Sequence, residues 1–138
     1  MKRVLFDSDV LLDVLAQRQP FVVASTLALN TVTQGQVQGY VSGHAVTNIF
    51  YILRRQIGTE AARELISRLL QRIQVASVTD DVIRQALQSP VTDFEDAVTS
   101  AVAIAAGLEA IVTRNTSDYS ASSVPAMLPE DFLATLSQ

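Results

Sequence analysis

The sequence predicts an α/β fold in which helices cover both faces of a central parallel sheet of four or five strands. Short apolar runs of strand type alternate with helix-type segments along the whole chain. Such alternation is typical of parallel sheets enclosed by helices, a three-layer α/β/α sandwich. There is no internal repeat and no linker long enough to divide the chain, so we expect a single domain over residues 1–138.

The first half of the chain begins with a strand-type run that turns directly into helical spacing. Pro20 is expected to open the next helix because proline suits a first helical turn, and Gly35 and Gly39 are expected to close it. The elements expected here are a strand at 4–6, helices near 10–15 and from 20, a strand at 37–42 and a helix at 45–57.

The second half continues the alternation. Gly58 is expected to end a helix and Thr59 to cap the next one. Pro90 and Gly107 mark the ends of later segments. The elements expected are a helix over 59–70, a strand over 73–78, a helix over 79–87, a helix over 93–106, strands at 110–113 and 124–127, and a closing helix opened by 129–131.

Composition excludes several classes of site. The chain has no cysteine, so disulfides, thiolate zinc sites and cysteine nucleophiles are absent. Its one histidine, His44, rules out a two-histidine metal site and makes a Ser-His-Asp triad unpromising. No apolar run reaches 18 residues, and acids interrupt the apolar start of the chain. We therefore expect a cytoplasmic protein with no membrane partner.

The charge balance is acidic, with a formal net charge of −4 and a pI near 4.8. Proteins that bind nucleic acid through charge alone are usually basic. A nucleic-acid enzyme of this composition would need positive charge from bound metal ions or from local arginines. An acidic surface also suits a basic protein partner.

Four aspartates follow or begin the elements that should meet at one edge of the sheet: Asp7, Asp93, Asp96 and Asp118. In parallel α/β sheets ligands bind beyond the carboxyl ends of the strands. Two bare carboxylates about 4 Å apart repel by roughly 4 kcal/mol at an effective dielectric of 20, so a cluster favours a cation. Mg²⁺ or Mn²⁺, which prefer oxygen ligands, would fit and would promote phosphodiester hydrolysis.

Each of these residues also has an ordinary structural explanation. Asp93 has the position of a helix N-cap, and Asp118 could close an Asx-turn. His44 is expected to make a hydrogen bond at a helix start. Other acids lie near helix starts, where their negative charge interacts favourably with the helix dipole.

Three segments resemble the family of PIN domains: VLFDSDVLLDVL, VSGHAVTNIFYILRR and DFEDAVTSAVAIAAGLEAIVTRNTSDY. They occur in the family's order, and the resemblance covers essentially the whole chain. The most similar group is the bacterial toxin ribonucleases of VapC-like toxin–antitoxin modules. The resemblance implies a PIN-like α/β/α fold, a Mg²⁺- or Mn²⁺-dependent endoribonuclease acting on RNA, a homodimer and a small antitoxin partner.

The resemblance also assigns roles to particular residues. Asp7, Asp96 and Asp118 match three acids of the family and are the expected metal ligands and catalytic acids, with Asp93 as an auxiliary acid. The resemblance places supporting residues around them, namely Ser8, Asp9, Asn48, Thr113 and Asn115.

Two positions depart from the family. Its second acid, usually a glutamate in the helix after the second strand, falls at Asn48, and Asn115 stands where many members have aspartate. Asparagine offers a carbonyl oxygen but no negative charge, so weaker metal binding is expected. Arg114 either contacts a substrate phosphate or is a solvated loop arginine.

Two alternative functions remain open. A PIN-fold module without catalysis would bind RNA or protein, and Asn48 and Asn115 favour this reading. A phosphatase of the haloacid-dehalogenase type, or a response-regulator receiver, would also place an acid after the first strand. Both need a basic residue, usually lysine, after a later strand, whereas the only lysine here is Lys2. Metal-dependent RNA cleavage would separate the nuclease from these alternatives.

Overall fold

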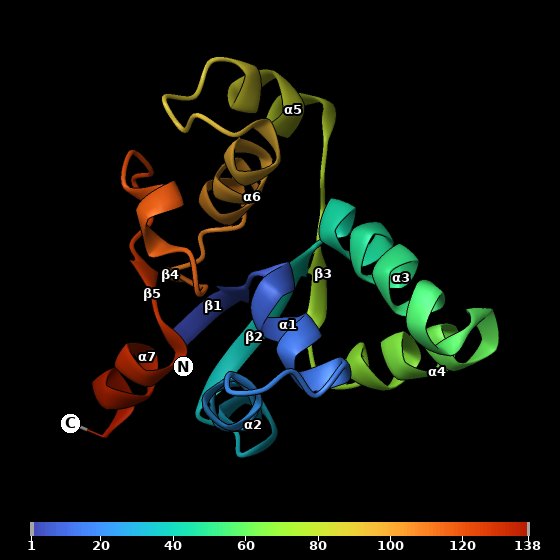
Figure 1. Cartoon of the computed structure of the whole chain (residues 1–138). Helices are drawn as coiled ribbons and strands as arrows, with labels where there is room; N and C mark the ends of the chain where they lie inside the picture. Colours follow the sequence, from blue (N-terminus) through green and yellow to red (C-terminus); the bar gives the residue numbers. More distant parts are fainter. Residues whose placement is uncertain (1, 138) are drawn as a thin grey trace.

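An all-parallel five-stranded sheet forms the centre of the molecule (Figure 1), which a computed structural model describes over residues 2–137. The strands lie in the order β3-β2-β1-β4-β5. Their bounds are β1 Lys2–Phe6, β2 Val37–Ser42, β3 Gln74–Ala76, β4 Ala110–Val112 and β5 Ala126–Met127. The prediction of a parallel sheet with four or five strands is therefore confirmed.

Helices fill the connections between the strands. Their bounds are α1 Ser8–Leu15, α2 Val22–Thr33, α3 Gly43–Ile57, α4 Thr59–Leu69, α5 Asp80–Leu87, α6 Phe94–Ala105 and α7 Pro129–Leu136, with a short 3₁₀ helix η1 at Thr116–Tyr119. No helix within residues 2–137 is long and apolar enough to cross a membrane.

The two faces of the sheet are covered by different helices (Figure 1), which gives the predicted three-layer arrangement. Side chains alternate along a strand, so Val4 and Phe6 of β1 point to one face and Leu5 to the other. The first face packs against α1, α2, α3, α4 and α7. The second face packs against α5, α6 and Tyr119 of η1.

Most element bounds agree with the sequence prediction, and the differences have local causes. Gly39 lies inside β2 and does not close the preceding helix. A glycine is needed at this position because an added Cβ would lie within 3 Å of the Val32, Ile73 and Phe6 side chains. Helix α2 begins two residues after Pro20. Residues 73–78 and 124–127 form shorter strands than predicted, because β3 and β5 are the outer strands and each pairs with one neighbour.

Candidate active site

Asp7 lies at the carboxyl end of the central strand β1, where the chain turns into α1. Its N–H donates to the Val112 carbonyl oxygen of β4 at 2.9 Å, which extends the strand pairing by one residue. Its carboxylate caps α1 by accepting the Ser8 N–H at 2.9 Å. Thr113, directly after β4, donates its hydroxyl to Asp7 Oδ2 at 3.0 Å. The parallel register thus places Asp7 and Thr113 side by side.

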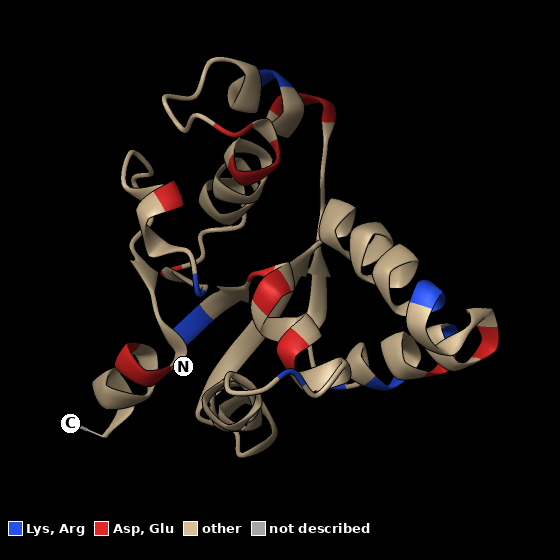
Figure 2. Cartoon of the chain, viewed as in Figure 1, with Lys and Arg blue, Asp and Glu red and all other residues tan. Residues whose placement is uncertain are grey.

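The start of α6 carries two more acids to the same edge of the sheet. Asp93 is the N-cap of α6 and accepts the Asp96 N–H at 3.0 Å, as the capping interpretation of Asp93 predicts. Asp96 follows in the first turn, where the helix dipole favours negative charge. Figure 2 shows acidic residues on α1, at the start of α6 and on η1 around this edge.

Tyr119 joins the acid that follows β1 to the acid at the start of α6. Its hydroxyl lies 2.9 Å from Asp7 Oδ2 and 3.2 Å from Asp96 Oδ1, and its side chain comes from η1. The residue is only 2% exposed. Asp7 and Asp96, which we call the open pair, therefore share a single hydroxyl proton between two carboxylates.

The open pair places negative charges close together without a positively charged partner within residues 2–137. Burial, followed by the charges of Asp7 and Asp93, raises the pKa of Asp96 from 3.8 to about 6. Burial and the two neighbouring carboxylates raise the pKa of Tyr119 well above its ordinary value, so Tyr119 stays a neutral donor. Within residues 2–137, the ion pairs of arginine involve Glu64, Asp80 and Asp13, and none reaches the open pair.

A cavity of about 550 Å³ lies beside Asp96. Asp93 and Asp118 also line it, and the exposed Asp118 raises the pKa of Asp96 through its charge. Three of the four predicted acids thus border one cavity, and Asp7 is linked to it through Tyr119 and Asp96.

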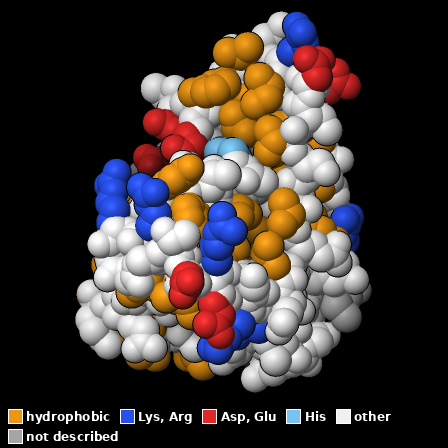
Figure 3. Space-filling model, turned by 90° about the vertical axis from the view of Figure 1, so that its right-hand side faces the viewer, with side chains coloured by type: hydrophobic (Ala, Val, Ile, Leu, Met, Phe, Trp, Pro, Cys, Tyr) orange, Lys and Arg blue, Asp and Glu red, His pale blue; other side chains and the backbone are white. Residues whose placement is uncertain are grey.

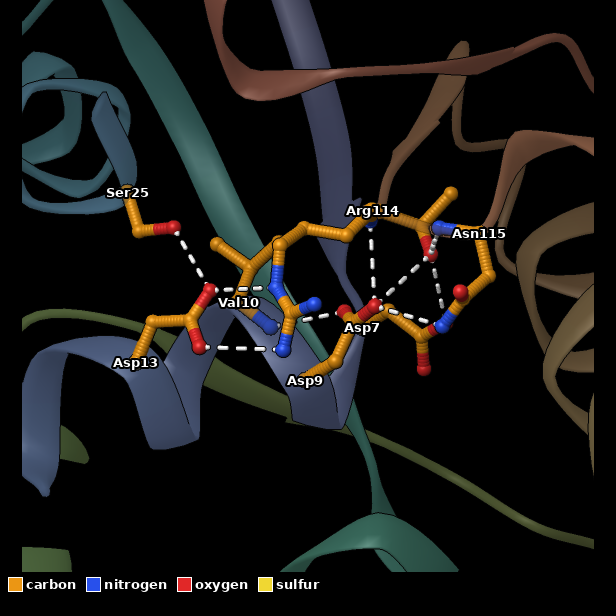
Figure 4. Close-up of polar contacts among 8 residues, drawn as sticks. Asp7, Asp9, Val10, Asp13, Ser25, Arg114 and Asn115 are labelled. Carbon is orange, nitrogen blue, oxygen red and sulfur yellow. Dashed lines mark hydrogen bonds and ion pairs between the residues drawn. The ribbon is translucent and has the colours of Figure 1, made fainter. Parts of the chain in front are cut away.

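Asp9 belongs to a different set of contacts, drawn in Figure 4. Its Oδ2 accepts the Arg114 N–H and the Asn115 amide, both at 3.0 Å, and its Oδ1 accepts the Val10 N–H at 2.7 Å. Burial and the charge of Asp7 raise the pKa of Asp9 to about 6, against the lowering effect of the two backbone donors. Asp9 therefore holds the loop after β4 against α1.

Asp13 completes this second set. It is 0% exposed and accepts from Arg114 Nε at 2.7 Å, Arg114 Nη2 at 3.2 Å and the Ser25 hydroxyl at 3.1 Å. The Arg114 guanidinium also lies 3.9 Å from the centre of the Phe21 ring. We call Asp9, Asp13, Arg114 and Asn115 the closed network, since N–H and O–H donors surround its two carboxylates (Figure 4).

Arg114 is accordingly not a solvated loop arginine, because its side chain is only 23% exposed and paired with Asp13. Its Nε and one N–H of Nη2 face Asp13, so a phosphate contact would have to use the other N–H groups of the guanidinium. That contact stays a prediction.

Asn48 on α3 contacts an acid that the sequence prediction did not include. Its amide nitrogen donates to Glu95 Oε1 at 2.5 Å, so a carboxylate from α6 lies at the end of the Asn48 side chain. His44 bonds to Ser42 at the start of α3, as expected, and its other ring nitrogen lies 3.3 Å from the Glu95 carbonyl oxygen. These contacts join the start of α3 to the start of α6.

Three residues of the site were therefore missed from the sequence: Tyr119, Asp13 and Glu95. Asp13 sits in an otherwise apolar helical stretch, a pattern that can signal a buried ion pair. Glu95 is adjacent to Asp96. Tyr119 had no local signal, because its partners lie 112 and 23 positions away.

The carboxylate oxygens of the open pair are ligands of the kind that a hard divalent cation prefers. Within the described part of the chain, no three acidic or histidine side chains are close enough to ligate one ion together. Mg²⁺, however, is commonly held by one or two carboxylates together with water and substrate phosphate. One hydroxyl proton facing two carboxylates leaves negative charge that such a cation would neutralise.

Solved structures of low sequence identity share this fold. A toxin–antitoxin complex from Klebsiella pneumoniae matches with a TM-score of 0.69 and 20% identity, over 91% of this chain and 97% of that chain. The DNA-bound VapBC of Salmonella typhimurium matches with a TM-score of 0.69 and 15% identity, over 94% and 99%. The sarcin-ricin loop cleaving toxin VapC20 of Mycobacterium tuberculosis matches with a TM-score of 0.64 and 19% identity, over 96% and 94%.

No curated protein sequence matches the chain significantly. A family model, described as PIN domain, matches residues 3–117. This range contains β1 from Arg3 onward, β2, β3 and β4, and the acids Asp7, Asp93 and Asp96, whereas Asp118 follows its last residue. The family model covers most of the chain and the all-parallel sheet agrees with it, so the chain belongs to the PIN domain family.

Proposed function

We propose that the protein is a Mg²⁺- or Mn²⁺-dependent endoribonuclease of the VapC-like toxin type, acting on RNA in the cytoplasm. The observation that supports this most is the open pair. Asp7 and Asp96 come from elements 89 positions apart, yet they face one buried hydroxyl and have no arginine partner within residues 2–137. Two close carboxylates without a positive partner lower the stability of the fold, and a role in holding a cation would explain why they are placed together.

The reaction is hydrolysis, in which water forms a new bond to phosphorus as one ester P–O bond breaks. A divalent cation at this site would supply activation of the water and neutralisation of the charge that develops on the phosphate. Asp7 and Asp96 would hold it, with Asp118 across the cavity and Asp93 beside Asp96. Acids at this edge would also repel RNA without a cation, so substrate and metal binding are expected to depend on each other.

Residues around the open pair orient it. The Ser8 N–H and the Thr113 hydroxyl each donate to Asp7, one to each carboxylate oxygen. Asp9 and Asn115 fix the loop that carries Thr113. We propose that Arg114 acts mainly in this way, through Asp13. Contact of Arg114 with a substrate phosphate is a further prediction.

A carboxylate lies beside Asn48, where the family resemblance leads us to expect an acid. The Glu95 carboxylate lies 2.5 Å from the Asn48 amide nitrogen, close to where a longer acidic side chain from α3 would end. We propose that Glu95 supplies the negative charge that the family usually places on α3. The departure at Asn48 therefore does not by itself imply a degenerate site.

We also propose an antitoxin partner and a homodimer. Two of the structures with the same fold are toxin–antitoxin complexes. Figure 3 shows hydrophobic side chains below the single histidine, on the side of the molecule that carries α3 and α4, and others above it at the height of α5 and α6. Tyr51 and Ile57 of α3 are 52% and 45% exposed there, and α3 and α4 form a groove lined by Phe50 and Ile66. Exposed apolar surface of this kind favours protein contact.

The test is cleavage of a mixed single-stranded and structured RNA pool by partner-free protein with Mg²⁺, Mn²⁺ or EDTA. We expect cleavage only with a divalent cation, and a loss of more than about 100-fold in Asp96→Asn, beyond the usual cost of removing a group that merely supports a ligand. Asp131→Asn, an exposed acid in the first turn of α7, is the matched control and should cleave normally.

A catalytically inactive PIN-fold binding module is the second candidate. It is favoured by the absence, within residues 2–137, of three acids close enough to ligate one ion, and by Asn115. Folded, partner-free protein that cuts no RNA with either cation, yet binds RNA, would favour this candidate over the nuclease.

A further inference from the structure

Tyr119 is the group that brings the open pair together. Its hydroxyl oxygen lies 2.9 Å from Asp7 Oδ2 and 3.2 Å from Asp96 Oδ1. The two carboxylate oxygens are therefore no more than about 6 Å apart. Oxygen ligands of one Mg²⁺ ion, at 2.0–2.1 Å from the metal, are at most about 4 Å apart. Tyr119 thus limits the separation of the two oxygens to at most about 2 Å more than a shared cation allows.

The ring of Tyr119 is fixed by packing. It is 2% exposed and belongs to the hydrophobic cluster between the sheet and α6. The end of η1 is held by its backbone, because the Ser122 N–H donates to the Tyr119 carbonyl oxygen at 2.9 Å. A hydroxyl carried on such a ring has little freedom to follow either carboxylate. Because Asp7 is also held by the Ser8 N–H and the Thr113 hydroxyl, the Tyr119 hydroxyl mainly positions the Asp96 carboxylate relative to Asp7.

We propose that Tyr119 is a positioning residue for the divalent-cation site, holding Asp7 and Asp96 at a binding-competent spacing before the cation arrives. This rests on the proposed function, since it assigns a role toward the cation of that site. Without the hydroxyl, Asp7 would stay held by Ser8 and Thr113, and repulsion would move the Asp96 carboxylate away from it. The cation would then have to draw them together, and its affinity would fall.

The first test measures cation binding without RNA. Isothermal titration of Mn²⁺ into wild type, Tyr119→Phe and Tyr40→Phe compares two buried tyrosines that each lose one hydroxyl. Tyr40 is 8% exposed and bonds to the Arg3 guanidinium, outside the acid cluster. We expect affinity to fall by about tenfold or more in Tyr119→Phe and to stay unchanged in Tyr40→Phe. Wild-type affinity in folded Tyr119→Phe would overturn the proposal.

The second test does not depend on folding of the Tyr119 variant. The chain has no tryptophan and three tyrosines, so Tyr119 is the only tyrosine left to be excited in a Tyr40→Phe/Tyr51→Phe variant. Tb³⁺ bound by the open pair should emit on tyrosine excitation, and Asp96→Asn should weaken this emission. Tb³⁺ that binds by calorimetry in an Asp96-dependent way but shows no sensitised emission would overturn the placement of Tyr119 beside the cation.

These outcomes separate the two proposals. Wild-type protein that binds no divalent cation and cuts no RNA would contradict the nuclease itself. Wild-type protein that binds Mn²⁺ and cuts RNA, together with an unaffected Tyr119→Phe variant, would contradict only the role of Tyr119.

Discussion

The open pair and the closed network lie at the same edge of the sheet, and both are built from aspartates, yet their hydrogen bonding differs. Asp13 is fully buried and receives two arginine donors and one hydroxyl. Asp7 and Asp96 share the Tyr119 hydroxyl, and the further side-chain contacts of Asp7 are to the neutral Ser8 N–H and Thr113 hydroxyl. Within residues 2–137 no arginine pairs with either acid. The closed network is complete as it stands, whereas the open pair lacks positive charge.

The difference shows that the charge of the donors, and not their number, separates the two sets. Asp7 accepts from three neutral donors, the Ser8 N–H and the Thr113 and Tyr119 hydroxyls, whereas Asp13 accepts from a charged guanidinium. A buried charge that is paired and hydrogen-bonded is retained at low cost, and removal of its partner is expensive. An under-paired carboxylate in a cavity is a candidate ligand. Asp9 lies between the two cases, because it has several donors but also feels the charge of Asp7.

The largest expected effect is on stability, from Asp13→Asn. The change leaves the mostly buried Arg114 guanidinium without its charged partner, which should lower the free energy of unfolding by about 3 kcal/mol and the melting temperature by roughly 10 °C. Thermal unfolding by circular dichroism measures this. Asp80→Asn is the control, since its pair with Arg84 is exposed and worth at most about 1 kcal/mol. Equal melting temperatures for the two variants would contradict the comparison.

A matched pair of substitutions should change stability in opposite directions in EDTA. Asp9→Asn places an amide N–H₂ group against existing donors and should destabilise by about 1 kcal/mol. Asp96→Asn removes repulsion from Asp7 and Asp93 and should stabilise by less than about 1 kcal/mol, since solvent screens the partly exposed site. Urea unfolding of both variants gives the two signs. Destabilisation by Asp96→Asn would mean that the open pair is not strained.

The role of Glu95 is tested by an exchange of charge between helices. Glu95→Gln should weaken Mn²⁺ binding by several-fold, less than Asp96→Asn, because Glu95 acts from the border of the site. Adding Asn48→Glu to Glu95→Gln should restore the affinity by returning a carboxylate to α3. Titration calorimetry of the single and double variants measures this, and failure of the rescue would place the Glu95 charge outside the cation site.

The smallest expected effect is a pH dependence of stability in EDTA. The pKa of Asp96 is about 6 in the folded protein, above its ordinary 3.8, so the folded state binds a proton that the unfolded state releases. The stability from this proton is present below the ordinary pKa and is lost as pH rises through 6. The stability difference between Asp96→Asn and wild type should therefore grow from pH 5 to pH 7. A constant difference would contradict the raised pKa.

Much of the fold was predictable because its signals are local. Apolar runs such as those of β1 and β4 mark buried strands, and caps such as Thr79 and Asp93 mark helix starts. Strand ends and Gly39 were less certain, because they depend on neighbouring side chains. Gly39 is needed where Phe6, Val32 and Ile73 crowd the backbone, and the sequence near Gly39 does not contain that contact.

The sequence by itself determined the alternation of strands and helices, the family, and the acids at the ends of those elements, because periodicity, caps and motifs are local properties. Only the tertiary structure decided which acids are paired. Arg114 reaches Asp13 across 101 positions, Tyr119 reaches Asp7 across 112, and Asn48 reaches Glu95 across 47. Such partners are set by strand order and packing, so the distinction between a satisfied carboxylate and an open one exists only after folding.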